Sequence, residues 1–486
     1  MRRIALALCL VGAYQSTGKI PITTRSDEAR GLYIRARALN EMLKSHDAYA
    51  LFSQAVAVDP AFAMAEYSLA TTAPSAKERS EHLEKALALS SSASPGERLF
   101  ILGLQARNRA DRSRARQLAE SLVVQYPRDE RAHGALGAIY SAQQVHTKAI
   151  AEYEAAIAIN PDYSLAYNQL GYAYRSVDNM AAAETAFRKY IALIPNDPNP
   201  YDSYAELLMK TGRFDESIAQ YRKALSIDSH FGGSYVGIAA NHMLAGRHAD
   251  AIAELRKYYA DARDDNERRT ALTNEAMVHV DHGGTDAAVA AMERSRAFAA
   301  AIGDTANMSA DDIAVGDILL AAGNVEAARD RYRQAHALVA ASSLPVDVKE
   351  DDELARRYDL ARVALAKHDL VAARADAAAY TAGAATRKND ARIRQSHELN
   401  GLLALGEKQF AASLRELAQA DQESPAVWYA MARAYAGTGD AAKANKLSAQ
   451  AAHANVLPTF AYVFTRAEIA AATRSATSEN THERRR

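Results

Sequence analysis

Three prolines recur along the chain at a constant interval. Pro127, Pro161 and Pro195 are each 34 residues apart, and Ser229 stands where the next one would fall. A constant interval of this length indicates a repeated supersecondary unit, because units that bury their apolar faces against each other repeat one pattern. The chain is 49% hydrophobic with only 23 Gly and 12 Pro among 486 residues, and runs of strand-forming residues are scarce. The sequence therefore predicts an all-α fold.

Small residues recur in pairs within each repeated unit. One small residue lies in the first helix of the unit and another lies 12 residues later in the second helix. Small side chains at both positions let the two helix axes approach closely, and aromatic residues such as Tyr153 and Phe187 fill the space between hairpins. The pairs are Gly137 and Ala149, Gly171 and Ala183, Ala205 and Ser217, and Ala239 and Ala251.

This pattern resembles the tetratricopeptide repeat. The resemblance implies an α-solenoid, a right-handed superhelix of about ten helical hairpins, in which the first helix of each hairpin lines the concave side. Gly212 and Gly246 fall between the helices of their hairpins, where a positive φ closes the first helix. The chain is also similar to exported bacterial tetratricopeptide-repeat proteins whose role is unassigned. That similarity lies in Tyr167–Arg175, Asn196–Ser229, Ile20–Thr24 and Glu28–Arg30.

Weaker repeat signatures continue on both sides of the best repeats, which span 130–229. We expect an N-terminal array over 26–263 and a divergent C-terminal array over 264–456. Irregular spacing near 301–309 and 342–353 indicates longer helices or intruding loops there. A capping helix is expected over 457–472, because end repeats need a polar outer face. Residues 473–486 are polar and lack apolar periodicity, which favours a disordered tail.

The first residues have the form of an export signal. Arg2 and Arg3 precede an apolar run over Ile4–Ala13 that is too short to span a bilayer. We therefore expect a signal peptide over 1–16 and a periplasmic location, with a buried first helix as the alternative. Cys9 is the only cysteine and lies inside that run, so a processed chain would have no disulfide and no thiolate ligand.

No motif indicates catalysis, a cofactor or a metal. The net charge of -1 provides no basic excess for nucleic acid. His279 and His282 lack the acidic partner of a zinc-protease helix, and the Gly437–Gly439 stretch lies at a hairpin turn rather than after a strand. We expect no enzyme activity, no cofactor and no bound metal.

The concave face supplies the candidate binding residues. Some proteins of the family hold a peptide carboxylate with Lys and Asn on first helices, but Gly134 and Ala138 occupy such positions here, so no clamp of that kind is expected. A strip of amide, aromatic and charged residues in the two best repeats is the candidate groove, with a solvated helix face as the alternative. The strip contains Asn168, Gln169, Tyr172, Arg175, Asn199, Asp202, Glu206 and Met209.

These features favour a non-catalytic scaffold or adaptor that binds a protein or peptide segment in the concave groove of a superhelix in the bacterial periplasm. Two alternatives remain open. One is a regulatory or sensory partner of a membrane or envelope complex. The other is an envelope carbohydrate- or lipid-associated factor, or an enzyme with an unrecognised site.

Overall fold

The computed structural model describes residues 18–483 apart from 43, 74–75, 110 and 388. The predicted signal peptide over 1–16, including Cys9, lies outside the described residues. The chain divides into two compact units, which we call unit 1 (Met1–Pro195) and unit 2 (Asn196–Arg486). The boundary between these units lies at Pro195 and Asn196, and the expected division into two repeat arrays at residues 263 and 264 stays a prediction. Two further prolines follow the boundary at the start of the next helix, Pro198 at the N-cap and Pro200 in the first turn, where the missing N–H removes no helical hydrogen bond.

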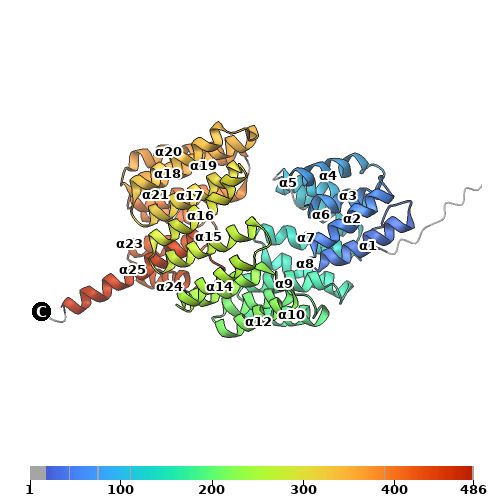
Figure 1. The fold of residues 1–486 in the computed structure, drawn as a ribbon, viewed down its shortest axis with the longest axis horizontal. Coiled ribbons are helices and arrows are strands. Elements are labelled where there is room, and N and C mark those ends of the chain that lie inside the picture. The colour runs from blue at the N-terminus through green and yellow to red at the C-terminus, as the bar shows by residue number, and fades with distance from the viewer. Residues whose placement is uncertain (1–17, 43, 74–75, 110, 388, 484–486) are drawn as a thin grey trace, which may run out of the picture. The chain divides into compact units, whose positions relative to one another are not determined.

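All regular secondary structure of the described residues is helical (Figure 1). The helices of unit 1 are α1 (Asp27–Glu41), α2 (Ser45–Val58), α3 (Ala63–Thr72), α4 (Ala76–Leu89), α5 (Pro95–Asn108), α6 (Arg112–Gln125), α7 (Glu130–Ala142), α8 (His146–Ile159), α9 (Ser164–Ser176) and α10 (Met180–Leu193). The helices of unit 2 are α11 (Asn199–Lys210), α12 (Phe214–Ile227), α13 (Gly232–Leu244), α14 (His248–Asp261), α15 (Asp265–Asp281), α16 (Thr285–Ala301), α17 (Thr305–Ala321), α18 (Val325–Ala341), α19 (Val346–Ala366), α20 (Leu370–Arg387), α21 (Asp390–Gly406), α22 (Phe410–Leu417), α23 (Pro425–Gly437), α24 (Ala441–Ala452) and α25 (Phe460–Glu483).

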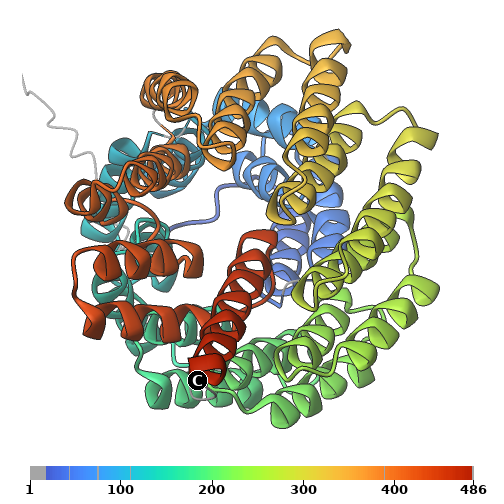
Figure 2. The ribbon, with the colours of Figure 1, turned by 90° about the vertical axis from the view of Figure 1, so that its left-hand side faces the viewer.

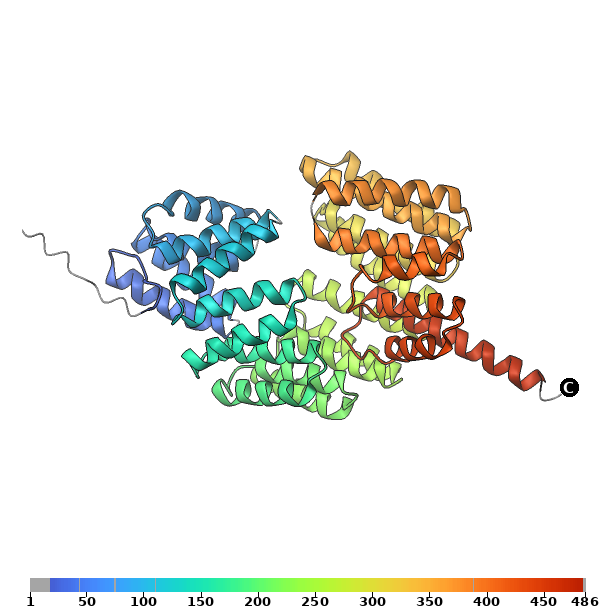
Figure 3. The ribbon, with the colours of Figure 1, turned by 180° about the vertical axis from the view of Figure 1, so that it is seen from behind.

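Consecutive helices pack as hairpins, from α1 with α2 to α23 with α24, and α25 follows the last pair. Within each unit every hairpin also packs on the next, as Figure 3 shows for the adjacent hairpins of unit 1. The predicted all-α solenoid is confirmed. The described residues form twelve hairpins rather than about ten, because the divergent repeats keep the hairpin geometry after losing much of the sequence pattern.

From the α7 and α8 hairpin onward, the turn inside each hairpin contains a residue with left-handed backbone. Gly212 and Gly246 have φ values of 74° and 75°, as the sequence predicted. In the two best repeats the same position is held by Gln144 and Asp178, both with φ of 58°. Left-handed backbone is sparsely populated by residues other than glycine. The hairpin turn therefore imposes this conformation whichever residue is present.

The predicted close approach of small residues is confirmed in one hairpin. The Ser217 hydroxyl of α12 donates to the carbonyl oxygen of Ala205 in α11 at 2.7 Å, so these two residues face each other directly. The structure adds a second contact. A Cβ atom built on Gly137 would lie 2.6 Å from the Tyr153 ring. The aromatic ring of the second helix therefore lies over the glycine of the first helix, within the hairpin.

The two units differ in the length of their helices. The helices of unit 1 have 10 to 15 residues, whereas α15 to α21 of unit 2 have 17 to 21 residues. The irregular spacing near 301–309 and 342–353 reflects this lengthening, since α17 begins at Thr305 and the 21-residue α19 begins at Val346. Longer helices change the spacing of repeat signatures without changing the hairpin.

The last helix differs from its expected role. Instead of a capping helix over 457–472 and a disordered tail from 473, one helix, α25, runs from Phe460 to Glu483, and the alanines that favour it are concentrated in its first half. It packs on α15 and α17 as well as on α23 and α24. Since α15, α17 and α23 are first helices of hairpins, α25 lies against the inner face of unit 2 (Figure 2).

Candidate functional site

The first helices of unit 1 line a groove with a volume of about 350 Å³, which we call the unit 1 groove. Its walls come from α1, α3, α5 and α7, and its floor includes residues of α6. The wall residues include Tyr33, Arg37, Asn40 and Glu41 of α1, Met64, Tyr67, Ser68 and Thr71 of α3, Leu99, Phe100, Gly103, Leu104 and Arg107 of α5, and Arg131, Gly134, Ala135 and Ala138 of α7.

The groove is deep at α5 because one hairpin lacks an aromatic ring. In the α9 and α10 hairpin, a Cβ on Gly171 would lie 2.7 Å from the Phe187 ring, which fills the slot between the helices. Gly103 occupies the matching position on α5, but the residue that corresponds to Phe187 is Ala119 on α6. A Cβ on Gly103 meets no atom within 4 Å. The missing ring therefore leaves space that opens into the groove.

The α7 wall is low for a similar reason. Gly134 and Ala138 lie one turn apart and so share a face of α7, and both line the groove. A Cβ on Gly134 would lie 3.3 Å from the Tyr163 hydroxyl, so there is little room for a larger residue at that position. The small residues that argue against a carboxylate clamp therefore help to form the cavity.

The groove combines aromatic surface with positive charge. Tyr67 and Phe100 lie with ring centroids 6.0 Å apart on adjacent first helices. Arg37 approaches Glu41 at 3.6 Å on α1, and burial raises the pKa of that carboxyl group despite the nearby guanidinium. Arg107 and Arg131 add two further cations. Aromatic rings and arginines are the residue types that most often carry binding energy at protein interfaces.

Arg131 is held in place by a buried carboxylate. Its guanidinium donates to Asp129 at 2.9 and 2.5 Å, and the Asp129 side chain is fully buried. Burial alone would raise the pKa of Asp129, but the hydrogen bonds and charge of Arg131 outweigh it, and the pKa lies below its usual range. Arg131 is therefore a fixed cation at the end of the groove.

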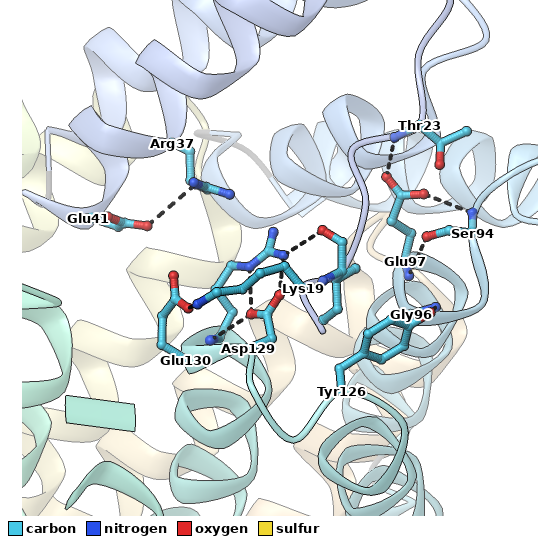
Figure 4. A network of polar contacts seen from close by, with 12 residues as sticks. Lys19, Thr23, Arg37, Glu41, Ser94, Gly96, Glu97, Tyr126, Asp129 and Glu130 are labelled. Carbon is cyan, nitrogen blue, oxygen red and sulfur yellow. Dashed lines mark hydrogen bonds and ion pairs between the residues drawn. The ribbon is translucent and has the colours of Figure 1, made fainter. Parts of the chain in front are cut away.

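A short segment of the chain lies beside this end of the groove. Residues 19–24, which we call the strap, precede α1 and have no regular secondary structure. The strap contacts the starts of α5 and α7, where Glu97 and Asp129 accept hydrogen bonds from it (Figure 4). Its Ile20 side chain is 3% exposed. The strap is thus a peptide segment bound along the edge of unit 1.

The predicted site residues of α9 lie in unit 1 but outside the lining of the unit 1 groove. Tyr172 packs edge-on against Phe187 with centroids 5.2 Å apart, and Arg175 lies over the Tyr172 ring at 4.7 Å. Asn168 is buried, and its Oδ1 atom has no hydrogen-bond partner among the described residues. Gln169 is half-buried. The structure brings Tyr172 and Arg175 together.

The predicted residues of α11 belong to unit 2. Asp202 accepts a hydrogen bond from the Ser234 hydroxyl at 2.7 Å. Burial, with a smaller contribution from the Glu206 charge, raises the pKa of Asp202 to about 7. Met209 is buried, and the backbone N–H of Asn199 donates to Asp197. Whether either set binds a partner stays a prediction.

The groove residues were not among the predicted site residues, although they follow the same helix-face spacing as the predicted ones. Asn168, Tyr172 and Arg175 are separated by four and then three residues, the spacing of one helix face. The same spacing gives Tyr33, Arg37 and Asn40 on α1, and Phe100, Leu104 and Arg107 on α5. The rule was applied to the repeats with the strongest signature, whereas the groove lies in the more divergent repeats before them.

A second cavity of about 550 Å³ lies within unit 2 between α18 and α19. His336 is 5% exposed beside it and is bound by Asp352 at 2.9 Å and Asp359 at 3.1 Å. Burial opposes the charged imidazole, but the two carboxylates outweigh it and raise the pKa of His336 to about 9. His336 therefore forms a charged bridge between α18 and α19.

Two other features of the described residues bear on chemistry. His279 and His282 lie with ring centroids 5.4 Å apart, but no cluster of three or more His, Cys, Asp or Glu side chains in residues 18–483 is arranged to hold a metal ion. In the part of the chain that the structure describes, no helix combines the length and apolar character needed to cross a membrane.

Comparison with known proteins identifies the repeat. The family model of the tetratricopeptide repeat matches residues 130–163, 165–197 and 199–231. No curated protein matches the sequence.

Among solved structures, a tetratricopeptide repeat protein from Parabacteroides merdae is 15% identical, with 56% of this chain and 94% of that chain covered and a TM-score of 0.36. The pilus biogenesis factor PilW is 22% identical over 42% of this chain and 94% of that chain, with a TM-score of 0.35. A thermophilic repeat protein from Thermus thermophilus is 20% identical over 44% and 98%, with a TM-score of 0.30.

Proposed function

The chain belongs to the tetratricopeptide-repeat family, and from that premise we propose that it binds a segment of a partner protein in the unit 1 groove. Repeats of this family form protein–protein interaction scaffolds and are typically non-catalytic. The scaffold role is therefore general to the fold. The proposal adds which surface of this chain receives the partner and what kind of segment fits there.

The single observation that carries the proposal is the open slot at Gly103. The next two hairpins along the chain fill the matching slot with a ring, Tyr153 beside Gly137 and Phe187 beside Gly171, whereas the Gly103 slot adds its volume to the groove. Cavities of about 300–1,000 Å³ are typical of binding sites. A groove of this volume between Phe100 and Ala138 accommodates one or two side chains of a docked segment, rather than a folded domain.

The polar groups of the groove fit a segment with its own hydrogen-bonding backbone. Asn40 and Ser68 present an amide and a hydroxyl, and Arg37 and Arg107 present donors for carbonyl or carboxylate oxygens. The aromatic surface of Tyr67 and Phe100 supports apolar side chains. We propose that the partner segment is extended, with apolar side chains facing α3 and α5 and with backbone or acidic oxygens facing the arginines.

We also propose that the protein acts after export to the periplasm, as a scaffold or adaptor. The support is the sequence alone, with Arg2 and Arg3 before the apolar run over Ile4–Ala13. Cell fractionation together with N-terminal sequencing tests this. A cytosolic chain that retains Met1 would contradict the location and leave the groove proposal unaffected.

Filling the slot tests the groove. In Gly103→Leu the new side chain enters open space, so the hairpin is expected to stay folded while the groove becomes shallower. The measurement is quantitative affinity capture from an envelope extract with the wild type and the variant in parallel. A partner that is lost or at least about tenfold depleted with Gly103→Leu supports the proposal.

A matched control exists on the same unit. Gly31 of α1 is exposed, a Cβ there also meets no atom within 4 Å, and it does not line the groove. Gly31→Leu adds the same side chain to a helix and should capture the partner as the wild type does. If every partner that the wild type captures is retained equally by both variants, the unit 1 groove is not the binding site.

A further inference from the structure

The strap makes the contacts of a bound peptide. Its Ile20 N–H donates to Asp129 at 2.7 Å, and its Thr23 N–H donates to Glu97 at 2.8 Å. The Ile20 carbonyl oxygen accepts from Arg131 at 2.8 Å. Figure 4 shows the strap beside the starts of α5 and α7, with the side chains of Glu97 and Asp129 directed at its backbone. Such contacts recognise an extended main chain and are independent of most side chains.

Two buried carboxylates accept the hydrogen bonds from the backbone N–H groups of the strap. The Glu97 side chain is 1% exposed and that of Asp129 is 0% exposed, yet each accepts a hydrogen bond from the strap. Glu97 also closes the capping box of α5 with Ser94. Both acceptors are therefore held in place by contacts other than those with the strap, and they form a rigid pair along the edge of unit 1.

One side chain of the strap is selected by shape. Ile20 is buried against Leu122 and Ala132, with Leu99 and Phe100 packed around it. A Cβ on Gly96 would lie 2.9 Å from the Ile20 side chain, so the pocket fits closely around the aliphatic group. Pro21 follows Ile20 and restricts it to extended backbone conformations.

The Ile20 pocket shares several side chains with the unit 1 groove. Leu99, Phe100, Leu122 and Ala135 line the groove and also pack around the cluster that holds Ile20. Arg131 belongs to the groove and donates to the strap as well. The strap therefore lies next to the open groove and packs on side chains that also line it.

We infer that the strap is a resident occupant of a peptide channel, and that the partner of the proposed function displaces it with an extended segment carrying a branched aliphatic residue followed by proline. This inference rests on the proposed function, because the channel is the unit 1 groove together with the Ile20 pocket. The partner segment repeats the chemistry of Ile20 and Pro21 at the pocket and continues toward Phe100 and Arg107.

Because the strap is covalently attached beside its own site, binding of a free peptide can be measured only when the strap is weakened. A segment joined to its own site by a short linker competes at an effective concentration in the millimolar range. A free peptide at micromolar concentration therefore binds the wild-type chain poorly even where it fits the pocket. Removing the Ile20 anchor lowers that competition and leaves Glu97, Asp129 and Arg131 in place.

The test uses a fluorescent peptide with the sequence of Gly18–Ser26 as the probe and the full chain as the receptor. Ile20→Asp puts a carboxylate in place of the anchor and should release the strap. We expect the Ile20→Asp chain to bind the probe at least about tenfold more tightly than the wild type in an anisotropy titration. A probe in which the residue matching Ile20 is Asp should not bind. Trypsin should also cut after Lys19 and Arg25 faster in the variant.

The matched control is Ile34→Asp, the same chemical change at a side chain on α1 that is 43% exposed. It should bind the probe no better than the wild type. If Ile20→Asp lowers the yield of folded chain, the double variant Lys19→Ala with Thr24→Ala removes the strap's contacts to Glu130 and Asp59 and leaves the pocket unaltered. Equal probe binding by the wild type and both released variants would overturn the inference and make the strap a structural element.

The outcome separates this inference from the proposed function. Partner capture that depends on Gly103 but is unchanged by Ile20→Asp leaves the groove as the binding site and rejects the strap as its competitor. Probe binding by the released chain without any Gly103-dependent partner supports the channel and rejects the proposed function. Capture that increases with Ile20→Asp and is lost with Gly103→Leu supports both.

Discussion

The two units present their first helices differently. In unit 1 the strap covers only the edge at the starts of α5 and α7, and the groove beside Phe100 is left open. In unit 2 the last helix lies across α15, α17 and α23, with Val463 fully buried between them and Tyr462 1% exposed. One hairpin design therefore supports an open groove on the first helices of unit 1 and first helices covered by α25 in part of unit 2.

The covering of unit 2 depends on a few residues of α25. Val463 packs in a cluster with Met277 and Ile318, and Arg466 pairs with the buried Asp281 at 2.7 Å. Full burial of an aliphatic side chain contributes about 1.5–3 kcal/mol. The rest of α25 projects past the hairpins of unit 2, and its residues from Ala470 to Arg474 are exposed (Figure 1). The contact thus lies in the first two turns of α25, from Phe460 to Arg466.

The interiors of the units also differ. Unit 1 packs rings on glycines, as Tyr153 does on Gly137. Unit 2 does the same, as Tyr332 does on Gly316, and its longer helices also bury a series of acidic side chains, among them Asp311, Asp312 and Asp359. Asp312 is fully buried and is bound by two arginines, Arg296 and Arg331, at 2.9 and 2.8 Å. Paired charges tolerate burial only when each has its partner, so unit 2 should respond to pH and to loss of single partners more strongly than unit 1.

The largest expected effect comes from exposing the inner face of unit 2. Val463→Asp places an unpaired carboxylate at a fully buried position, which costs about 4 kcal/mol unless α25 leaves its site. We expect α25 to detach and unit 2 to melt at a lower temperature. Trp428, the only tryptophan, lies in α23 of unit 2, so its fluorescence reports that transition.

The control for this change is Ala470→Asp, which adds the same charge to an exposed position of α25. It should leave the Trp428 transition within a few tenths of a kcal/mol of the wild type. Hydrogen exchange of the amides over 460–468 gives the second measurement. Unchanged protection there in Val463→Asp would mean that α25 does not cover unit 2 through this contact.

Alkaline pH should weaken unit 2 through His336. Its pKa of about 9 in the folded chain lies above the ordinary value of 6.5, so the stabilisation is fully present below pH 6.5 and is lost as the pH rises through 9. The loss amounts to as much as about 3 kcal/mol. Urea titrations between pH 6 and 9.5, followed by Trp428 fluorescence, measure it. In His336→Gln the free energy of unfolding of unit 2 should depend less on pH. An equal dependence on pH in that variant would assign the effect to other groups.

Overpacking should weaken unit 1 by a smaller amount. In Gly171→Leu the new Cβ would lie 2.7 Å from the Phe187 ring, which is fully buried and has little room to move. Overpacking of this kind costs about 1–3 kcal/mol. Part of the helical circular dichroism should be lost at a lower temperature than in the wild type, while the transition seen by Trp428 fluorescence is unchanged. Equal shifts of both signals would show that the units unfold together.

Features of the fold that depend on residues close together in the sequence could be predicted, and features that depend on distant residues could not. The hairpin around Gly137 and Ala149 was predicted correctly because its signature is local and repeats at a fixed interval. The divergent α19 and the other long helices of unit 2 carry the same fold with fewer signature residues, and the count of hairpins was accordingly too low.

The features that decide which face is open are not local. The strap is held by residues about one hundred positions away, as in the contact of Lys19 with Glu130. Arg466 meets Asp281 across 185 positions. Neither pair lies at a repeat interval, so periodicity carries no information about it. The open slot was visible in principle, because Ala119 breaks the pattern set by Tyr153 and Phe187, but a missing ring is a weak signal until the neighbouring hairpins are placed.

The smallest predicted effect sharpens the contrast between an open and a filled slot. Gly103→Ala adds a methyl group that meets no atom within 4 Å, in the middle of α5. Alanine is favoured over glycine in a helix by about 1 kcal/mol, so unit 1 should become more stable by up to that amount. Gly171→Ala has the same helix propensity gain, but its methyl carbon would lie 2.7 Å from Phe187 and should reverse the sign. Urea unfolding of the two variants, followed by circular dichroism, compares them directly. Destabilisation by Gly103→Ala would mean that the slot is closed in solution, and the unit 1 groove would then lack the space on which partner binding depends.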